Sequence, residues 1–178
     1  MRFISGKHRG RKINLPKNLN IRPTTDLSKE SLFNILNNTF EFSDISFLDL
    51  FSGSGSISFE FASRGCKKIT SVDINHNAIK FIKSISNQLE LGINCIKSDT
   101  IRFINNSEQN FDIIFADPPY NYNVNMYEEL IVSLFENNIL KNKGMIVIEH
   151  SKKNRLVSII NYKETREYGG CCFSFFYM

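Results

Sequence analysis

The chain has 178 residues, of which 42% are hydrophobic and 22% are charged, and its formal net charge is +4. A chain of this length can bury its own core without disulfide bonds, so we expect a single domain over residues 1–178. The best candidate for a membrane span, Gly144–Ile148, is far shorter than the roughly 20 apolar residues required, and the charged N-terminus lacks the apolar core of a signal peptide, which excludes membrane insertion and favours a cytoplasmic protein.

The positive charge is concentrated at the N-terminus. Seven basic residues precede the first acid, Asp26, whereas residues 26–178 carry 15 bases and 18 acids, a net charge of −3. Turn-like glycines between short apolar pieces predict a small β-hairpin over 2–15. A basic hairpin can contact nucleic-acid phosphates, and a solvated basic surface is the alternative. We expect 1–22 to form a basic arm on a catalytic core over 23–178, with RNA contacts from Arg2, Lys7, Arg9, Arg11 and Lys12.

Strands and helices alternate along the rest of the chain. Apolar periodicity predicts a first helix from its expected N-cap, Asp26, to about Asn38, and later helices near 57–64, 77–89 and 126–135. This pattern predicts an α/β fold with one mostly parallel sheet and helices on both faces. The seven expected strands are Ile45–Phe51, Lys68–Val72, Ile93–Lys97, Phe111–Ala116, Gly144–Glu149, Val157–Tyr162 and Cys171–Tyr177.

A glycine turn follows the first of these strands. Gly53 and Gly55 allow a sharp turn and a close approach of a ligand to the backbone, and the next helix begins with free N–H groups. Ser58 occupies the third glycine position of a dinucleotide fingerprint, which argues against NAD or FAD. Asp73 and Asp99 follow the next two strands, where they could bind a ribose and an adenine amine or could be a solvated aspartate and a helix cap. Together the three strand ends fit an adenosine-containing ligand.

The strongest motif is Asp117-Pro118-Pro119-Tyr120, directly after an apolar strand. The two prolines fix the backbone and donate no N–H, so the carbonyls of this loop are rigid acceptors. A carboxylate and such a carbonyl can accept both protons of a planar amine, and a tyrosine ring can stack on a base. A proline-rich turn without a further role is the alternative.

The four cysteines do not indicate a metal site. Cys66, Cys95, Cys171 and Cys172 show no C-x-x-C spacing, and no paired histidines complete a zinc set. We therefore expect reduced thiols and no bound metal.

Together these motifs resemble the bacterial 16S ribosomal RNA guanine-N2 methyltransferases, which have the class I fold that depends on S-adenosyl-L-methionine. The resemblance implies a Rossmann-like fold, S-adenosyl-L-methionine as the cofactor, and methylation of the exocyclic N2 amine of a guanine in 16S rRNA. It further implies a substrate within an assembled or assembling small subunit, and we expect the enzyme to be a monomer. The similarity spans nearly the whole chain, through GKHRGRKI (6–13), RPTTD (22–26), ESLFNIL (30–36), LDLFSGSGSISFEFASRG (48–65), the strand-end Asp73 and DPPY (117–120).

The resemblance also implies a role for individual residues. Asp117, Pro118 and Tyr120 would receive the target base and act as the catalytic residues, with positioning and polarisation of the amine in place of a strong base. Val72 stands where relatives often have an acid, so ribose recognition would depend on Asp73 alone. The implied cofactor-binding residues are Arg22, Pro23, Thr24, Thr25, Asp49, Phe51, Gly53, Gly55, Asp73 and Asp99.

Two alternatives remain at this stage. One is an adenine-N6 methyltransferase of the same fold, acting on DNA or RNA, because the DPPY motif alone does not separate guanine from adenine. The other is an RNA-binding module that has lost catalysis, against which the intact glycines and DPPY motif argue. Asp rather than Asn at position 117 argues against glutamine methylation, and the short chain leaves no room for a separate DNA target-recognition domain.

Overall fold

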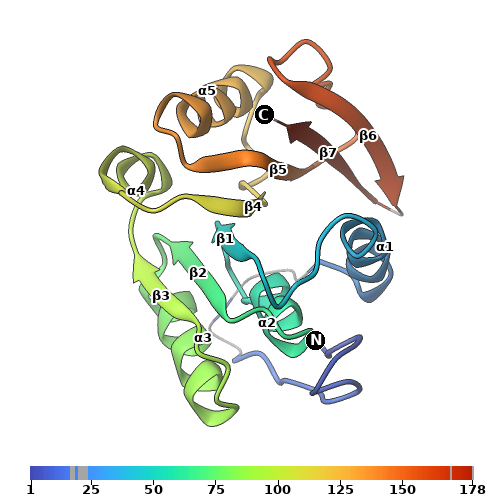
Figure 1. Ribbon diagram of the computed structural model, residues 1–178, viewed down its shortest axis with the longest axis vertical. Helices are drawn as coiled ribbons and strands as arrows, with labels where there is room; N and C mark the ends of the chain where they lie inside the picture. Colours follow the sequence, from blue (N-terminus) through green and yellow to red (C-terminus); the bar gives the residue numbers. More distant parts are fainter. Residues whose placement is uncertain (17–18, 20–23, 169, 178) are drawn as a thin grey trace.

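A seven-stranded sheet crosses the computed structural model, which describes residues 1–16, 19, 24–168 and 170–177 (Figure 1). The strand order is β3-β2-β1-β4-β5-β7-β6. Strands β1 to β5 pair in parallel, whereas β7 runs antiparallel to both β5 and β6. The expected mostly parallel sheet is therefore confirmed, with an antiparallel end. The strands are β1 Ser46–Leu50, β2 Lys68–Asp73, β3 Asn94–Lys97, β4 Phe111–Ala116, β5 Leu140–His150, β6 Tyr162–Tyr168 and β7 Cys171–Tyr177.

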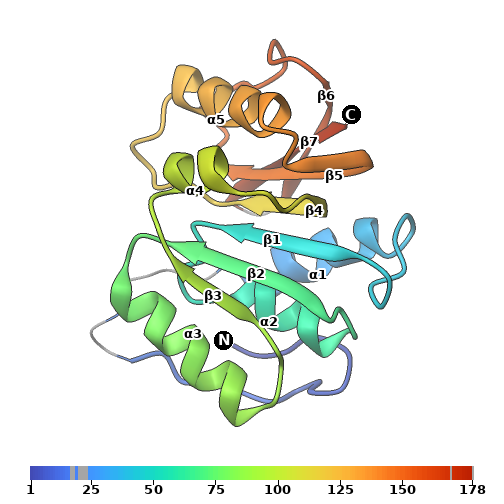
Figure 2. The same ribbon diagram turned by 60° about the vertical axis from the view of Figure 1, so that its left-hand side comes forward.

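Helices cover both faces of the sheet, as expected (Figure 2). One buried cluster joins α1, α2 and α3 to one face, and a second joins α4 and α5 to the other. Side chains alternate along a strand, so the neighbours Phe47 and Leu48 of β1 enter opposite clusters. Burial on both faces explains the continuous apolar runs within β4 and β5, at residues 113–116 and 145–148. The helices are α1 Asp26–Leu36, α2 Ser56–Ser63, α3 His76–Gln88, α4 Thr100–Asn106 and α5 Val124–Glu136.

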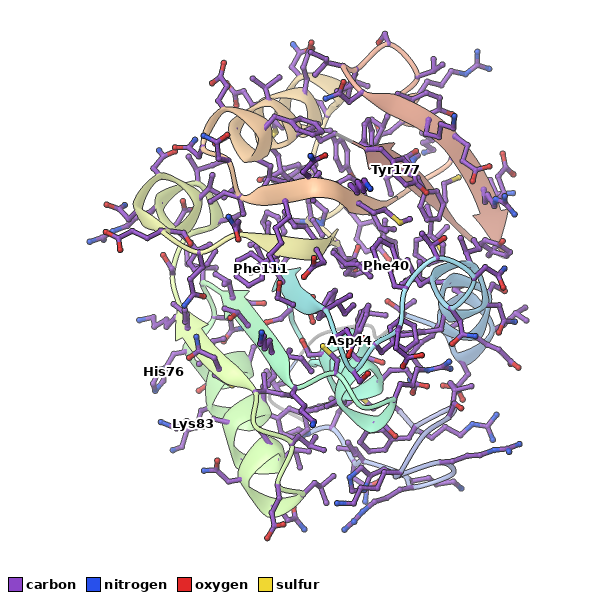
Figure 3. The ribbon with its side chains drawn as sticks, viewed as in Figure 1. Phe40, Asp44, His76, Lys83, Phe111 and Tyr177 are labelled. Atoms are coloured by element: carbon purple, nitrogen blue, oxygen red, sulfur yellow. The ribbon has the colours of Figure 1, made fainter. Side chains whose placement is uncertain are left out.

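Helix α3 shows how one apolar stripe decides which side faces the sheet. Ala78, Ile79 and Ile82 are buried, while Lys83 points away from the sheet into solvent (Figure 3). The side chain of Asn75 caps this helix by accepting hydrogen bonds from its first N–H groups. This packing fixes the end of β2, which directly precedes α3.

The N-terminal segment packs against α2. The expected hairpin is present in short form, because residues 1–3 and 11–13 pair antiparallel through a bridge between Arg2 and Lys12 and a backbone hydrogen bond from Phe3 N–H to the Arg11 carbonyl at 3.0 Å. The fully buried carboxylate of Glu60 accepts hydrogen bonds from the backbone N–H groups of Ile4 and Ser5, at 2.8 and 2.9 Å. Ser63 Oγ donates to the Ser5 carbonyl at 2.6 Å. The segment is therefore anchored to the helix that follows the glycine turn.

Two expected elements were placed wrongly, and one helix was missed. The strand expected at Val157–Tyr162 is instead β6, Tyr162–Tyr168, while residues 157–161 form turns. This strand lies at the sheet edge and exposes most of its charged side chains, so it lacks the apolar run that marks buried strands. Helix α1 is capped by Thr25, and Asp26 is its first residue. Helix α4 was not predicted from the sequence, and its N-cap is Asp99. None of the helices in the described ranges is long and apolar enough to span a bilayer.

Candidate active site

A cleft of about 460 Å³ opens where β1, β2, β4 and β5 end. Its walls come from the segments that follow these four strands, from residues 24–28 at the start of α1, and from the beginning of β7. The carboxyl ends of parallel strands meet at one edge of a sheet, which is where ligands bind in open α/β folds. The ends of β1, β2 and β4 therefore converge on one site, as expected, whereas Asp99 after β3 does not line it.

The glycine turn forms one side of this cleft. Gly53 and Phe51 both have left-handed backbone conformations, with φ of 50° and 58°. For phenylalanine such a conformation costs on the order of 1–3 kcal/mol, so the surrounding structure holds the turn in place. The carboxylate of Asp73 does part of this work, because it accepts hydrogen bonds from the N–H groups of Gly53 at 2.7 Å and Asn75 at 2.8 Å. Ser52 Oγ is buried and has no hydrogen-bond partner among the described residues, so a ligand in the cleft could satisfy it.

Gly55 serves packing between helices. A Cβ added at this position would lie 2.8 Å from Cγ1 of Ile82 and 3.0 Å from the Phe59 ring. The backbone φ of +73° would add strain to any substitution. A Gly55→Val change would therefore disturb the contact of α2 with α3, whereas Gly55 was expected to leave room for a ligand to approach the backbone.

Three carboxylates lie on the same face of neighbouring strands. Asp49 is two residues beyond Phe47 on β1, and Asp117 and Glu149 lie two residues beyond Phe115 and Val147. Residues two apart share a face of a strand, so these side chains continue the row begun by the apolar ones. All three line the cleft and give it a negative charge when ionised.

Asp49 is the most enclosed of these acids. It is 2% exposed, and it accepts hydrogen bonds from the N–H and Oγ of Ser58. Burial raises the pKa of Asp49 to about 7, although the hydrogen bonds from Ser58 favour its ionised form and the charge of Asp73 opposes it.

The DPPY loop offers acceptors that receive no hydrogen bond from the described residues. No described residue donates a hydrogen bond to the side chain of Asp117 or to the carbonyl of Pro118. Burial raises the pKa of Asp117 well above its usual value, and the charges of Glu149 and Asp49 raise it further. Asp117 is half-buried and Pro118 is buried, and both line the cleft, so a ligand there can donate hydrogen bonds to acceptors that the described residues leave free.

Glu149 was not predicted as a site residue. It is 9% exposed, and Thr24 Oγ1 donates a 2.9 Å hydrogen bond to its Oε2 atom. Burial raises the pKa of Glu149, while hydrogen bonds from Thr24 and the thiol of Cys171 partly offset this effect. The expected strand already ended at Glu149, so the strand-end reasoning applied to Asp117 would also have found it.

Aromatic rings line a second wall and the mouth of the cleft. Phe51 meets Tyr122 edge-on at 5.6 Å between ring centroids, and Tyr122 meets Tyr127 at 5.4 Å. Tyr127 in turn lies 6.1 Å from the ring of His150. At the mouth, Tyr120 is 86% exposed, so its face is free to stack on a flat ligand.

Comparisons with known proteins agree with this geometry. The family model described as conserved hypothetical protein 95 matches residues 1–177. The ribosomal RNA small subunit methyltransferase D of Haemophilus influenzae is 35% identical over 179 residues, covering 94% of this chain and 87% of its own. The protein of the same name from Buchnera aphidicola (subsp. Baizongia pistaciae) is 34% identical over 160 residues, covering 89% and 80%. The solved structure of Escherichia coli yhhF is 27% identical with a TM-score of 0.84 and covers 99% of this chain and 96% of its own.

The chain belongs to the ribosomal RNA small subunit methyltransferase D family. In this family member, the cleft is lined by all three residues expected to be catalytic, Asp117, Pro118 and Tyr120. Arg22 and Pro23 lie outside the described residues. Six of the expected cofactor-binding residues also line the cleft, namely Thr24, Thr25, Asp49, Phe51, Gly53 and Asp73.

Asp99 and the basic arm lie elsewhere on this family member. Asp99 does not line the cleft, and its side chain caps α4 by accepting a 3.0 Å hydrogen bond from the N–H of Arg102. In the arm, Arg2 forms a 2.8 Å ion pair with Asp26. The other expected RNA contacts are exposed and form no ion pair with any described residue, namely Lys7, Arg9, Arg11 and Lys12. None of the five basic residues lines the cleft.

The structure describes all four cysteines of this family member. All four cysteines are free, and burial raises the pKa of the Cys66 thiol to about 11 and of the Cys171 thiol to about 12. Such thiols are weakly reactive at neutral pH. Within the described part of the chain, no group of three or more His, Cys, Asp or Glu side chains could hold a metal ion.

Proposed function

We propose that this chain methylates the exocyclic N2 amine of a guanine in 16S rRNA, with S-adenosyl-L-methionine as the methyl donor. The observation that carries the proposal is the pair of free acceptors at the cleft, the Asp117 carboxylate and the Pro118 carbonyl. An exocyclic amine has two N–H donors that match them. The names of the family relatives support rRNA of the small subunit as the substrate.

The glycine-turn side of the cleft fits the cofactor. Asp73 can accept hydrogen bonds from ribose hydroxyls beyond those it already receives, because a carboxylate has about four acceptor sites. The unpartnered hydroxyl of Ser52 and the open turn at Gly53 offer polar contacts beside it. When ionised, the acids Asp49 and Asp117 give the cleft a negative potential that suits a cation. S-adenosyl-L-methionine supplies an activated methyl group on such a cationic sulfonium.

Positioning then accounts for most of the expected rate enhancement. Asp117 and Pro118 hold the amine in one orientation and draw electron density onto its nitrogen. Alignment of the amine with the methyl group is worth on the order of 7 kcal/mol or more. The methylated amine loses a proton, and the raised pKa of Asp117 makes its carboxylate a suitable acceptor for it.

RNA binding is assigned to two surfaces. The exposed ring of Tyr120 stacks on the extruded base, because a base inside a helix cannot place its amine in the cleft. The exposed cations of the N-terminal arm contact backbone phosphates, which position the RNA without reading its sequence. We assign the arm to 1–22 and the catalytic core to 23–178 of a single domain. The enzyme acts as a cytoplasmic monomer on an assembled or assembling small subunit.

The test is transfer of radiolabelled methyl groups to total RNA and to isolated small subunits, followed by nucleoside analysis. We expect labelled N2-methylguanosine from 16S rRNA. Labelled N6-methyladenosine would support the adenine enzyme instead, and cofactor binding without any transfer would support the inactive module. Asp117→Ala should keep its cofactor affinity by calorimetry and lose at least about 100-fold in turnover, the scale for one hydrogen-bonding group at the reacting centre.

A further inference from the structure

We propose that Glu149 selects guanine over other purines by accepting a hydrogen bond from N1–H of the target base, beside Asp117, which accepts from the N2 amine. The inference deepens the proposed function and rests on it. Glu149 would then touch the substrate and determine its identity, whereas Asp117 and Pro118 prepare the amine for reaction.

Strand pairing places the two acids together. In the parallel register of β4 and β5, Ala116 is the partner of Ile148. Asp117 and Glu149 are the next residues on these strands, so their side chains leave the sheet side by side and on the same face. Both line the cleft, and the charge of Glu149 raises the pKa of Asp117, as expected for close neighbours.

The carboxylate of Glu149 can accept further hydrogen bonds beyond those it receives from the protein. Thr24 Oγ1 donates to Oε2, and the Cys171 thiol also approaches the carboxylate. A carboxylate can accept about four hydrogen bonds. Because Glu149 lines the open cleft, a ligand there can donate a hydrogen bond to one of the remaining sites in place of water.

The edge of guanine matches this pair of acids. Guanine carries N1–H next to its N2 amine, so two adjacent acceptors face two adjacent donor groups. Adenine and 2,6-diaminopurine have a lone pair at N1, which would face the ionised carboxylate of Glu149 without a hydrogen bond and with electrostatic repulsion. A site built to pair with a donor rejects an analogue that lacks it far more strongly than a hydrophobic pocket does.

A purely structural role is the competing explanation. Glu149 could serve only to tie Thr24, and thereby the segment before α1, to the end of β5. The two roles can be distinguished with a substrate analogue that keeps the reacting N2 amine and lacks the hydrogen at N1. 2,6-Diaminopurine does this, because it retains the N2 amine and presents a lone pair at N1.

The experiment compares methylation of RNA or reconstituted subunits that carry either guanine or 2,6-diaminopurine at the target position. The wild type should favour guanine by at least about 100-fold in kcat/KM. In Glu149→Gln the amide can turn and donate to N1, so the preference should fall to within about 10-fold whatever the remaining activity. Thr24→Val removes the tether but keeps the carboxylate, so its preference should stay near that of the wild type.

Several outcomes would overturn the inference. Equal use of the two bases by the wild type would do so without any variant, and this measurement does not depend on the folding of a mutant. An unchanged preference in Glu149→Gln would also do so, once thermal unfolding and cofactor calorimetry show that the variant is folded. If the wild type produces no N2-methylguanosine, the proposed function fails as well, so the two failures are distinguishable.

Discussion

The fully buried carboxylate of Glu60 accepts a 2.9 Å hydrogen bond from the backbone N–H of Ser5, across 55 residues of sequence. The bond joins the N-terminal segment to α2, the helix that begins directly after the glycine turn. The same carboxylate also pairs with Arg64 at 2.8 Å. The basic arm is therefore held in a fixed position against α2. Loss of this contact should weaken RNA binding more than it changes the cleft.

Two glycines of the arm form a matched pair for testing this contact. Gly6 and Gly10 both have φ of +79°, but a Cβ at Gly6 would lie 1.8 Å from the carbonyl oxygen of Ser63, whereas a Cβ at Gly10 meets nothing within 4 Å. Gly6→Ala should therefore destabilise the fold by about 1–3 kcal/mol more than Gly10→Ala, and it should also weaken RNA binding. Thermal unfolding and RNA titration measure the two effects. Equal melting temperatures would show that the arm is not tied to α2.

Salt dependence tests whether the arm contacts phosphates. Replacement of Arg9, Arg11 and Lys12 with Gln should reduce the slope of log affinity against log salt by about 2–3 units, because each phosphate contact releases roughly 0.7–0.9 of a counterion. Cofactor affinity and the choice of nucleotide should not change.

A second triple variant controls for total charge. Lys80 and Lys83 on α3 and Lys97 on β3 are also exposed, and their replacement with Gln removes the same charge from a surface outside the arm. We expect this control to leave the slope within about 1 unit of the wild type. If the arm variant and the control have identical slopes, the arm is an ordinary solvated surface, and the basic residues at 152–155 become the next candidates.

Tyr120 should act through its ring and not its hydroxyl. Its side chain is 86% exposed at the cleft, so Tyr120→Phe should retain activity, whereas Tyr120→Ala should lose roughly 10-fold or more in kcat/KM, as expected from about 1–3 kcal/mol per stacked base. Neither change should alter stability by more than about 0.5 kcal/mol, because the ring packs against little else. Similar kinetics for the Ala and Phe variants would exclude base stacking at this residue.

The raised pKa of Asp49 predicts that the stability of the protein depends on pH. Its pKa is raised from 3.8 to about 7 in the folded state, so the folded protein holds a proton that the unfolded chain releases between about pH 4 and pH 7. The contribution of Asp49 to stability is therefore greatest below pH 4 and is lost as the pH rises through 7. Asp117 and Glu149 have raised pKa values and act in the same direction, so the wild type alone does not isolate Asp49.

An isosteric variant isolates this residue. Asp49→Asn removes the buried charge, so it should raise the free energy of unfolding relative to the wild type by clearly more at pH 8 than at pH 5, where the folded carboxyl still holds its proton. Chemical denaturation at the two pH values measures the difference. A stabilisation of the same size at both values would show that Asp49 titrates normally.

The central fold was predictable because its signals are local. Strands β4 and β5 contain continuous apolar runs, 113–116 and 145–148, that are buried on both faces, so composition alone marks them. Edge strand β6 is half polar and was placed too early, because a strand with one exposed face and no outer neighbour needs no apolar run. The position of β7 between β5 and β6 follows from pairing that no local pattern encodes.

The candidate site also has parts that the sequence predicts and parts that only the tertiary structure brings together. The glycine turn and the DPPY loop are contiguous motifs, so the sequence by itself identified Gly53, Asp117 and Tyr120. Only the tertiary structure brought Glu149 beside Asp117, because strands β4 and β5 pair through backbone hydrogen bonds that depend on register and not on side-chain identity. It also showed that Gly55 packs against α3. A glycine can leave room for a ligand or for a neighbouring helix, and which of the two applies depends on residues elsewhere in the chain.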